Sequence, residues 1–304
     1  NTAIGFGALT ETTTGSSNTS VGRLSLASNV TGQQNTAVGK GTLNANLASD
    51  NTAVGMNAML NNTTGANNTA VGLSALLTNT TSSNNTAVGY TALTANTTGT
   101  ENVALGANAL DANTTADANT AIGYNAATTL VTGGYNVALG HSALLNNATG
   151  VNNVAIGYQT LNNNASPTAN VAIGYRACKN NNSNYGVFIG DRSASNGIVS
   201  GEKNVSVGHY SLFSLTTGAY NVAIGANTLD DVTTGTNNTA VGNSALGANT
   251  ASDNTAVGSG ALDANTTGTL NVAVGRSALG ANTTASENTS VGVESLENNQ
   301  TGQQ

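Results

Sequence analysis

The residues best suited to chemistry or recognition gather in one section of the chain, residues 167–220. This section holds the only proline, the only cysteine and four of the seven lysine and arginine residues. Aromatic rings beside cationic side chains are typical of sites that bind sugars by stacking and hydrogen bonding. The section predicts a ligand patch formed by Tyr175, Arg176, Lys179, Tyr185, Phe188, Arg192, Lys203 and Tyr210. The alternative is a tolerated irregularity, or a joint between two repeat arrays, that binds nothing.

Residue types that catalyse reactions or bind metals are otherwise sparse. His141 and His209 lie in separate repeats and are predicted to be surface residues. Asp230 and Asp231 form an acidic pair, but no further oxygen ligands for calcium are indicated. Cys178 stands where most repeats have leucine, which favours a small buried side chain over a reactive or interchain thiol. No Ser-His-Asp set, Cys/His metal spacing or phosphate-binding glycine loop is evident. We therefore expect no catalytic residues, no enzyme activity, no cofactor and no metal.

The whole chain is built from one short repeat. The pattern Asn-[Thr/Val]-Ala-[Val/Ile/Leu]-Gly recurs every 16 to 18 residues from Asn1, and gives eighteen repeats. A short period sustained over a whole chain is typical of a solenoid, in which each unit stacks on its neighbours. We predict an all-β fold, a parallel β-solenoid of eighteen coils of about 17 residues, as a single array over residues 1–304 with an irregular section at 167–220. Neither end shows an atypical capping repeat, so we expect a segment of a longer fibre.

Within a repeat, positions are numbered here from the leading asparagine. Positions 2 to 4 alternate and are rich in β-branched residues, which predicts a short strand. Position 4 is always Val, Ile or Leu and is expected to point into the core, with position 2 on the same face. Position 3, almost always Ala, is then expected to face outward as a stripe of small residues, either against a partner chain or as a flat face with no partner. After the strand we predict a corner, a second short strand and an Asn/Thr/Gly turn.

Position 5 is glycine in every repeat. Such regularity predicts a corner that needs a positive φ angle or a very close backbone approach. The corner glycines are Gly5, Gly22, Gly39, Gly55, Gly72, Gly89, Gly106, Gly123, Gly140, Gly157, Gly174, Gly190, Gly208, Gly225, Gly242, Gly258, Gly275 and Gly292.

Two asparagine positions are candidates for side-chain ladders that connect the coils. Position 1 is Asn in seventeen repeats, with Gly186 as the exception. Position 12 is Asn in thirteen repeats but apolar at Leu130, Leu215 and Val232. Position 12 is either solvent-facing and variable, or inward-facing with Asn in a hydrogen-bonded ladder that an aliphatic side chain can replace. Many of these asparagines form Asn-x-Ser/Thr sequons, which we interpret as a by-product of the Asn/Thr-rich turns.

The repeats resemble two groups of fibrous proteins. Asn68-Thr-Ala-Val-Gly72 and Asn170-Val-Ala-Ile-Gly174 are similar to the head repeats of YadA-like trimeric autotransporter adhesins, and to the repeats of phage and virus tail fibres. The resemblance covers all eighteen repeats. It implies three chains of left-handed parallel β-roll joined along a threefold axis, with a role in attachment.

These observations lead to one main functional expectation and one alternative. We expect a structural or adhesive fibre, extracellular or on a cell or virion surface, assembled as a homo-oligomer, with a host-surface glycan or protein as its receptor. The net charge of −7 argues against nucleic acid, and the absence of a long apolar run argues against membrane insertion of this segment. The alternative is a monomeric ice- or crystal-binding solenoid with a flat Thr-rich face. A fibre-borne glycan-degrading enzyme is disfavoured because no acidic pair lies on matching faces.

Overall fold

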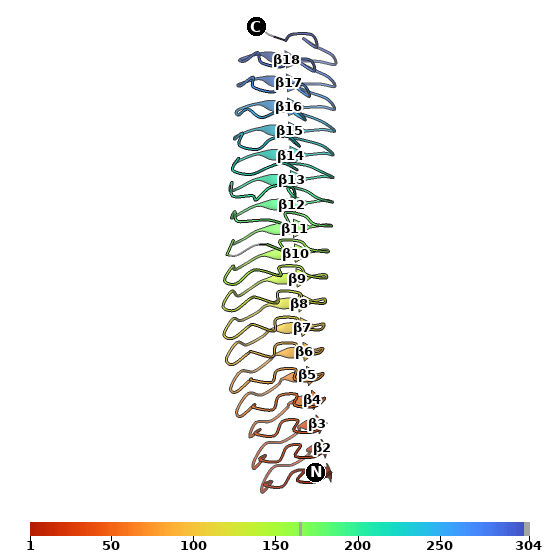
Figure 1. Cartoon of the computed structure of the whole chain (residues 1–304), viewed down its shortest axis with the longest axis vertical. Coiled ribbons are helices and arrows are strands. Elements are labelled where there is room, and N and C mark those ends of the chain that lie inside the picture. Colours follow the sequence, from red (N-terminus) through yellow and green to blue (C-terminus); the bar gives the residue numbers. More distant parts are fainter. Residues whose placement is uncertain (164–165, 301–304) are drawn as a thin grey trace. The chain divides into compact units, whose positions relative to one another are not determined.

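The computed structural model describes residues 1–163 and 166–300 and shows an all-β parallel β-solenoid with one three-residue strand in each repeat (Figure 1). The chain divides into two compact units, Asn1–Asn152 and Asn153–Gln304. Within the described residues no helix could cross a membrane.

The first unit contains β1 (Thr2–Ile4), β2 (Thr19–Val21), β3 (Thr36–Val38), β4 (Thr52–Val54), β5 (Thr69–Val71), β6 (Thr86–Val88), β7 (Val103–Leu105), β8 (Thr120–Ile122) and β9 (Val137–Leu139). The second contains β10 (Val154–Ile156), β11 (Val171–Ile173), β12 (Val187–Ile189), β13 (Val205–Val207), β14 (Val222–Ile224), β15 (Thr239–Val241), β16 (Thr255–Val257), β17 (Val272–Val274) and β18 (Thr289–Val291).

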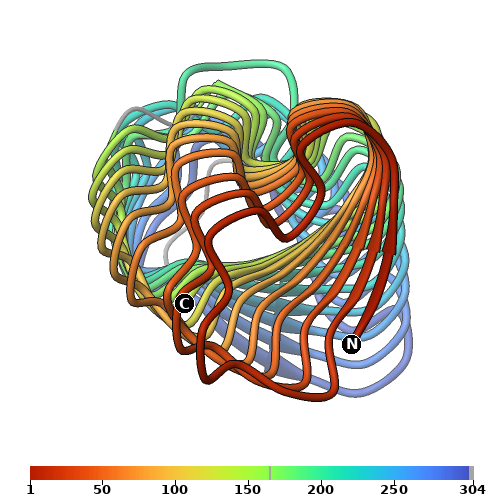
Figure 2. The same cartoon turned by 90° about the horizontal axis from the view of Figure 1, so that it is seen from below.

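Each strand pairs in parallel with the equivalent strand of the next coil of its unit. The register places like on like, as in Ala70 opposite Ala87 and Ala223 opposite Ala240. One repeat is therefore one full turn of the solenoid, and each residue stacks on the residue at the same position of the preceding repeat. Seen end on, successive coils within each unit follow the same indented outline (Figure 2). The predicted β-solenoid is confirmed.

The predicted direction of the strand side chains is wrong. Position 3 points inward: Ala37, Ala70 and Ala104 are completely buried. Position 4 points outward, and Val38 and Leu105 keep 36% and 45% of their surface exposed. The coil is too narrow to hold two facing rows of large aliphatic side chains. The leucines at position 9 fill the interior from the opposite side, so the regular coils have room only for a small side chain, alanine or serine, at position 3. The alanine stripe is consequently core, and cannot serve as an interface between chains.

The predicted second strand is also absent from the described coils. Positions 7 and 9 adopt left-handed backbone conformations, as at Ser74 (φ 56°) and Leu76 (φ 50°). Two left-handed residues separated by one residue turn the chain too sharply for an extended strand. A bulky side chain in this conformation costs about 1–2 kcal/mol. Full burial of the leucine side chain stabilises by about 1.5–3 kcal/mol and offsets that strain.

The glycine corner is confirmed at position 5. All eighteen glycines have φ between 128° and 147°. The backbone of the next coil lies against the corner glycines from Gly5 to Gly123 in the first unit and from Gly157 to Gly275 in the second: a Cβ atom on Gly72 would sit 2.2 Å from the carbonyl oxygen of Gly89. Both reasons that the sequence gives for glycine therefore apply at this position.

Both asparagine ladders are present and lie inside the coils. At position 1, the Asn68 backbone N–H donates to Asn51 Oδ1 at 3.0 Å, and Asn68 Nδ2 donates to the Ser82 carbonyl at 2.9 Å. At position 12, Asn79 Nδ2 donates to Asn62 Oδ1 at 2.7 Å. Asn62 is fully buried, as is the apolar replacement Leu130, so the inward alternative for position 12 is confirmed. The sequon asparagines in these ladders are inaccessible to glycan attachment in the folded chain.

Leu130 interrupts the position-12 ladder of the first unit. Its side chain has no hydrogen-bonding group to offer the coils on either side. Asn113 Oδ1 in the preceding coil and Asn147 Nδ2 in the following coil are buried without a hydrogen-bond partner. The interruption thus has a local cost, because each buried unpaired polar atom destabilises by about 1–3 kcal/mol.

Candidate ligand-binding hollow

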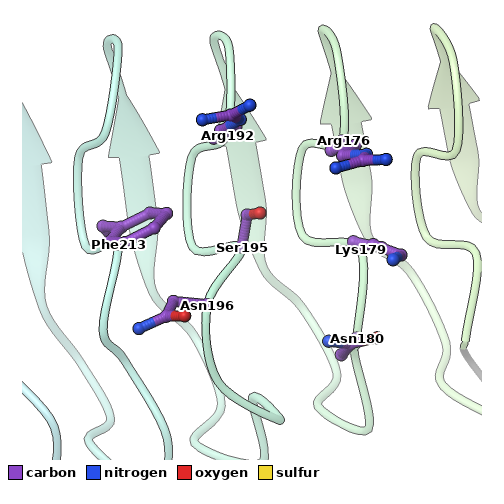
Figure 3. Close-up of a pocket in the computed structure, with 7 residues that line it drawn as sticks. All are labelled: Arg176, Lys179, Asn180, Arg192, Ser195, Asn196 and Phe213. Atoms are coloured by element: carbon purple, nitrogen blue, oxygen red, sulfur yellow. The ribbon is translucent and has the colours of Figure 1, made fainter.

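A shallow hollow of about 330 Å³ lies within the second unit, over the coils that contain β11, β12 and β13. Its lining comes from three rows of stacked positions (Figure 3). Position 7 contributes Arg176 and Arg192, position 10 contributes Lys179, Ser195 and Phe213, and position 11 contributes Asn180 and Asn196. All three rows follow the glycine corner, so the hollow lies away from the outward strand face.

The shape of the hollow follows from the side-chain sizes along position 10. Ser195 is short and stands between the long side chains of Lys179 and Phe213, which leaves a depression at its own coil (Figure 3). The same coil carries two extra residues after this point. The bridge Asn181–Val199 spans 18 residues, whereas the strand partners Val171 and Val187 are 16 apart. The additional residues bulge at Gly197 and Ile198, and the Ile198 side chain is 62% exposed.

The two arginines are held by aromatic rings. The Arg176 guanidinium carbon lies 5.1 Å from the centre of the Tyr175 ring and 5.9 Å from that of Tyr158. The guanidinium of Arg192 lies 5.8 Å from Tyr175 and 5.5 Å from Tyr210. Stacking on rings favours a fixed guanidinium plane and leaves N–H groups at its edge for a ligand.

Hydrogen bonds add to this positioning. Arg176 Nε donates to Gln159 Oε1 at 3.1 Å. Arg192 Nη1 donates to the Tyr210 hydroxyl oxygen, and this hydrogen bond raises the pKa of the Arg192 guanidinium. Both guanidinium groups are therefore held in a defined orientation.

The positive charge of the hollow is not balanced by ion pairs within the chain. Among the described residues, the ion pairs within 4 Å join His209 to Asp191 and Arg276 to Glu294. Arg176, Lys179 and Arg192 take part in neither. Asp191, beside Arg192, is the nearby carboxylate, and its Oδ2 faces His209 Nε2 at 3.6 Å. Three of the seven basic residues of an acidic chain thus meet around one depression.

The structure places the eight residues of the predicted patch in four different environments. Arg176, Lys179 and Arg192 line the hollow, and Tyr175 and Tyr210 hold the arginines beside it. Tyr185 and Lys203 do not line it. They occupy the last position of their repeats, where Lys203 Nζ lies 5.2 Å from the centre of the Tyr220 ring.

Phe188 requires a correction, because it is completely buried and presents no surface to a ligand. It occupies the inward position 3, and the coil accommodates the ring by losing side chains elsewhere. Gly186 replaces the ladder asparagine, where a Cβ atom would lie 2.3 Å from Phe188 Cε2. Position 9 is Ala194 in the same coil and Cys178 in the preceding one, in place of leucine. The irregular composition of this section is therefore partly a rearrangement of the core.

Four lining residues were missed by the sequence analysis: Asn180, Ser195, Asn196 and Phe213. The spacing within the repeat could have indicated two of them. Ser195 and Phe213 stand at position 10, three residues after Arg192 and Tyr210 at position 7, as Lys179 does after Arg176. The two asparagines follow position 10 directly and carry no distinguishing signal in a chain so rich in asparagine.

The remaining candidates have separate environments. Cys178 is fully buried, and burial raises the pKa of its thiol, which confirms the buried interpretation over a reactive thiol. His209 is about half exposed, as predicted for a surface residue. The pKa of the Asp230 carboxyl is raised, mainly by burial and to a smaller extent by the charge of Asp231. In the part of the chain that the structure describes, no three His, Cys, Asp or Glu side chains are grouped to hold a metal ion.

No protein-family model matches this chain, and no curated protein matches it significantly. The fold is shown by the structure, and the function has to be argued from the surface.

Proposed function

We propose that this chain is a structural and adhesive fibre segment whose copies associate through the outward face of their strands. The single observation that supports this proposal is an outward stripe, within each unit, of aliphatic side chains at position 4 beside threonine or valine at position 2. Every strand contributes Val, Ile or Leu at position 4 and Thr or Val at position 2. Several position-4 side chains in coils with a neighbour on both sides remain 36% to 45% exposed, among them Val54, Leu105 and Leu139. Monomeric proteins rarely expose apolar surface of such extent.

The partner that best fits this stripe is another copy of the same chain. The stripe carries no charged residue at either position, so it offers nothing to a charged partner. Within each unit its side chains repeat with the coil spacing of about 4.8 Å, and the same unit of a second copy has the same spacing. Three copies around one axis, as in the fibres that the repeats resemble, would cover the stripe of every chain.

The energetics are compatible with such an assembly. Burying the exposed remainder of one position-4 side chain stabilises by about 0.5–1.5 kcal/mol. The nine coils of one unit therefore offer about 5–13 kcal/mol, comparable with the cost of about 4–15 kcal/mol for association. The position-2 residues and the second unit add to this gain. The proposed role, in extracellular or virion-surface attachment, requires stiffness and binding rather than catalysis.

Matched charge substitutions test the proposed interface. Leu105→Glu with Leu139→Glu places charges on the stripe, at residues that are 45% and 41% exposed. Tyr90→Glu with Tyr124→Glu places the same charges at position 6 of the same unit, at residues that are 54% and 52% exposed. We expect light scattering to show loss of the oligomer in the leucine variant alone. An unchanged oligomer in the leucine variant would contradict this interface.

A second candidate, an ice- or crystal-binding solenoid, is favoured by one feature of the first unit. The strands β1 to β6 all have threonine at the outward position 2, which forms a row of hydroxyl groups on one face. Valine replaces threonine on β7 and β9, and position 4 is aliphatic throughout. A thermal-hysteresis measurement separates the two functions. Ice activity from a monomeric chain would favour this second candidate over the fibre.

A further inference from the structure

We propose that the hollow over β11, β12 and β13 binds an acidic oligosaccharide, through Arg176 and Arg192 to its carboxylate or sulfate groups and with Phe213 against a sugar ring. This inference deepens the attachment function proposed above and rests on it for its biological purpose. The binding itself requires only the second unit of one chain, because all seven lining residues lie there.

The cations of the hollow have the arrangement that a chain of anionic groups requires. Arg176 and Arg192 occupy position 7 in successive coils, and the coil spacing is about 4.8 Å. Guanidinium groups bind carboxylate and sulfate oxygens through paired N–H donors. The bonds to Gln159 and Tyr210 use one nitrogen of each arginine. Arg176, Arg192 and Lys179 line the same hollow as Ser195 (Figure 3).

The other lining residues favour a sugar over a simple anion or an acidic peptide. Asn180, Ser195 and Asn196 supply neutral donors and acceptors of the kind that bind sugar hydroxyls. Phe213 lies at one end of the hollow, and its ring packs edge-on against Tyr210 with centroids 4.6 Å apart. An aromatic ring fixed by such a neighbour provides a flat apolar surface for the C–H face of a pyranose.

The hollow is open rather than enclosed, and its charge sits on an otherwise acidic chain of net charge −7. We therefore expect modest affinity at a single site and strong dependence on salt, because exposed charges are screened within about 8–10 Å at physiological ionic strength. Several chains in one fibre would present several such sites and raise the overall avidity.

Titration calorimetry of the whole chain with defined oligosaccharides tests the inference. The probes are tetragalacturonate, which carries carboxylates, and a heparin-derived tetrasaccharide, which also carries sulfates; cellotetraose is the neutral control. We expect at least one acidic sugar to bind and cellotetraose not to bind. Failure of both acidic sugars at millimolar concentration would overturn the proposal. Hexaglutamate that binds as tightly as the sugars would also overturn it, in favour of an acidic peptide.

Two double variants show whether the hollow is responsible. Arg176→Gln with Arg192→Gln removes the paired guanidinium groups, and about 100-fold weaker binding is expected from the loss of two charge-assisted contacts. Arg23→Gln with Lys40→Gln is the matched control. It removes two exposed cations from position 6 of successive coils in the first unit, with the same change of net charge. Equal weakening in both variants would overturn the assignment to this hollow.

Light scattering on the same samples separates this inference from the proposed fibre. A monomeric chain that binds acidic sugar through Arg176 and Arg192 would refute the fibre and retain the site. An oligomeric chain without sugar binding would refute the site and retain the fibre.

Discussion

Substitutions that restore the consensus residues at Gly186 and Phe188 should have strongly non-additive effects on the free energy of unfolding. Phe188 and Gly186 both depart from the repeat, and the ring fills the space that the ladder asparagine occupies elsewhere. We consider Gly186→Asn, Phe188→Ala and the double variant. In the double variant, the asparagine side chain can enter the vacated space and rejoin the ladder at Asn170, whose Oδ1 now accepts only the Gly186 N–H, at 2.8 Å.

The expected magnitudes follow from the contacts. A Cβ atom on residue 186 would lie 2.3 Å and 2.6 Å from two ring atoms of Phe188, so Gly186→Asn overpacks the core and costs about 1–3 kcal/mol. Phe188→Ala leaves a cavity beside the small side chains of Ala194 and Cys178, and costs about 3–5 kcal/mol. Additivity would give the double variant a loss of about 4–8 kcal/mol. Filled space and two ladder hydrogen bonds reduce the expected loss to about 2–4 kcal/mol.

The assay is guanidinium unfolding of all four proteins, with hydrogen exchange across β12 as a local measure, because long repeat arrays need not unfold in one step. The predicted coupling energy is about 2–4 kcal/mol, favouring the double variant. Additive losses within about 0.5 kcal/mol would refute the reasoning, since they would mean that Phe188 and Gly186 do not share space.

Three further predictions concern the backbone and the charges of the first unit. Gly39→Ala should destabilise by about 2–5 kcal/mol in chemical unfolding, because its Cβ would lie 2.6 Å from the Gly55 carbonyl oxygen. Gly41→Ala in the same coil should cost only about 1–2 kcal/mol, because its Cβ would meet the side chain of Asn57, which can move, rather than backbone. Equal losses in the two variants would contradict this reasoning. Glu101 is exposed and has φ 60°, a conformation that glycine favours and a β-branched residue disfavours. The Glu101→Gly variant should therefore unfold at higher denaturant concentration than the parent chain, and the Glu101→Val variant at lower concentration. The free energies of unfolding of the two variants should differ by about 1–2 kcal/mol, a difference that a strain-free backbone would not show. Burial raises the pKa of Asp111, so the folded state holds that proton more tightly than the unfolded state and loses stability as pH rises through the raised value. Asp111→Asn should therefore raise the melting temperature at neutral pH, with the gain shrinking as the pH falls into the usual carboxyl range; a gain that does not vary with pH would refute this origin.

The sequence predicts the fold well because its period is so regular. Repeating glycine at position 5 identified the corner, and repeating asparagine made positions 1 and 12 candidates for ladders, with the direction of position 12 left open. Alternation along the strand showed that positions 3 and 4 face opposite ways, but it could not show which of them faces inward. That choice depends on the width of the coil, which is set by the leucine that reaches across from position 9.

The left-handed conformations at positions 7 and 9 could not be predicted either. Leucine disfavours positive φ, and its burial overrides that preference only within the folded coil. At the candidate site, the sequence identified the basic residues and the tyrosines beside them. The depression itself depends on the short Ser195 between two long neighbours and on the bulge at Gly197 and Ile198, features of shape that composition does not reveal. Phe188 was misplaced because its strand was expected to face the other way.

The most direct test of the account is the molar mass of the purified chain in solution, measured by light scattering coupled to size exclusion. We have proposed that further copies of the chain cover the outward stripe of positions 2 and 4. This proposal predicts a mass near three times the chain mass of 29.9 kDa. A mass of 29.9 kDa that persists at high protein concentration would contradict it, because the stripe would then remain exposed to water.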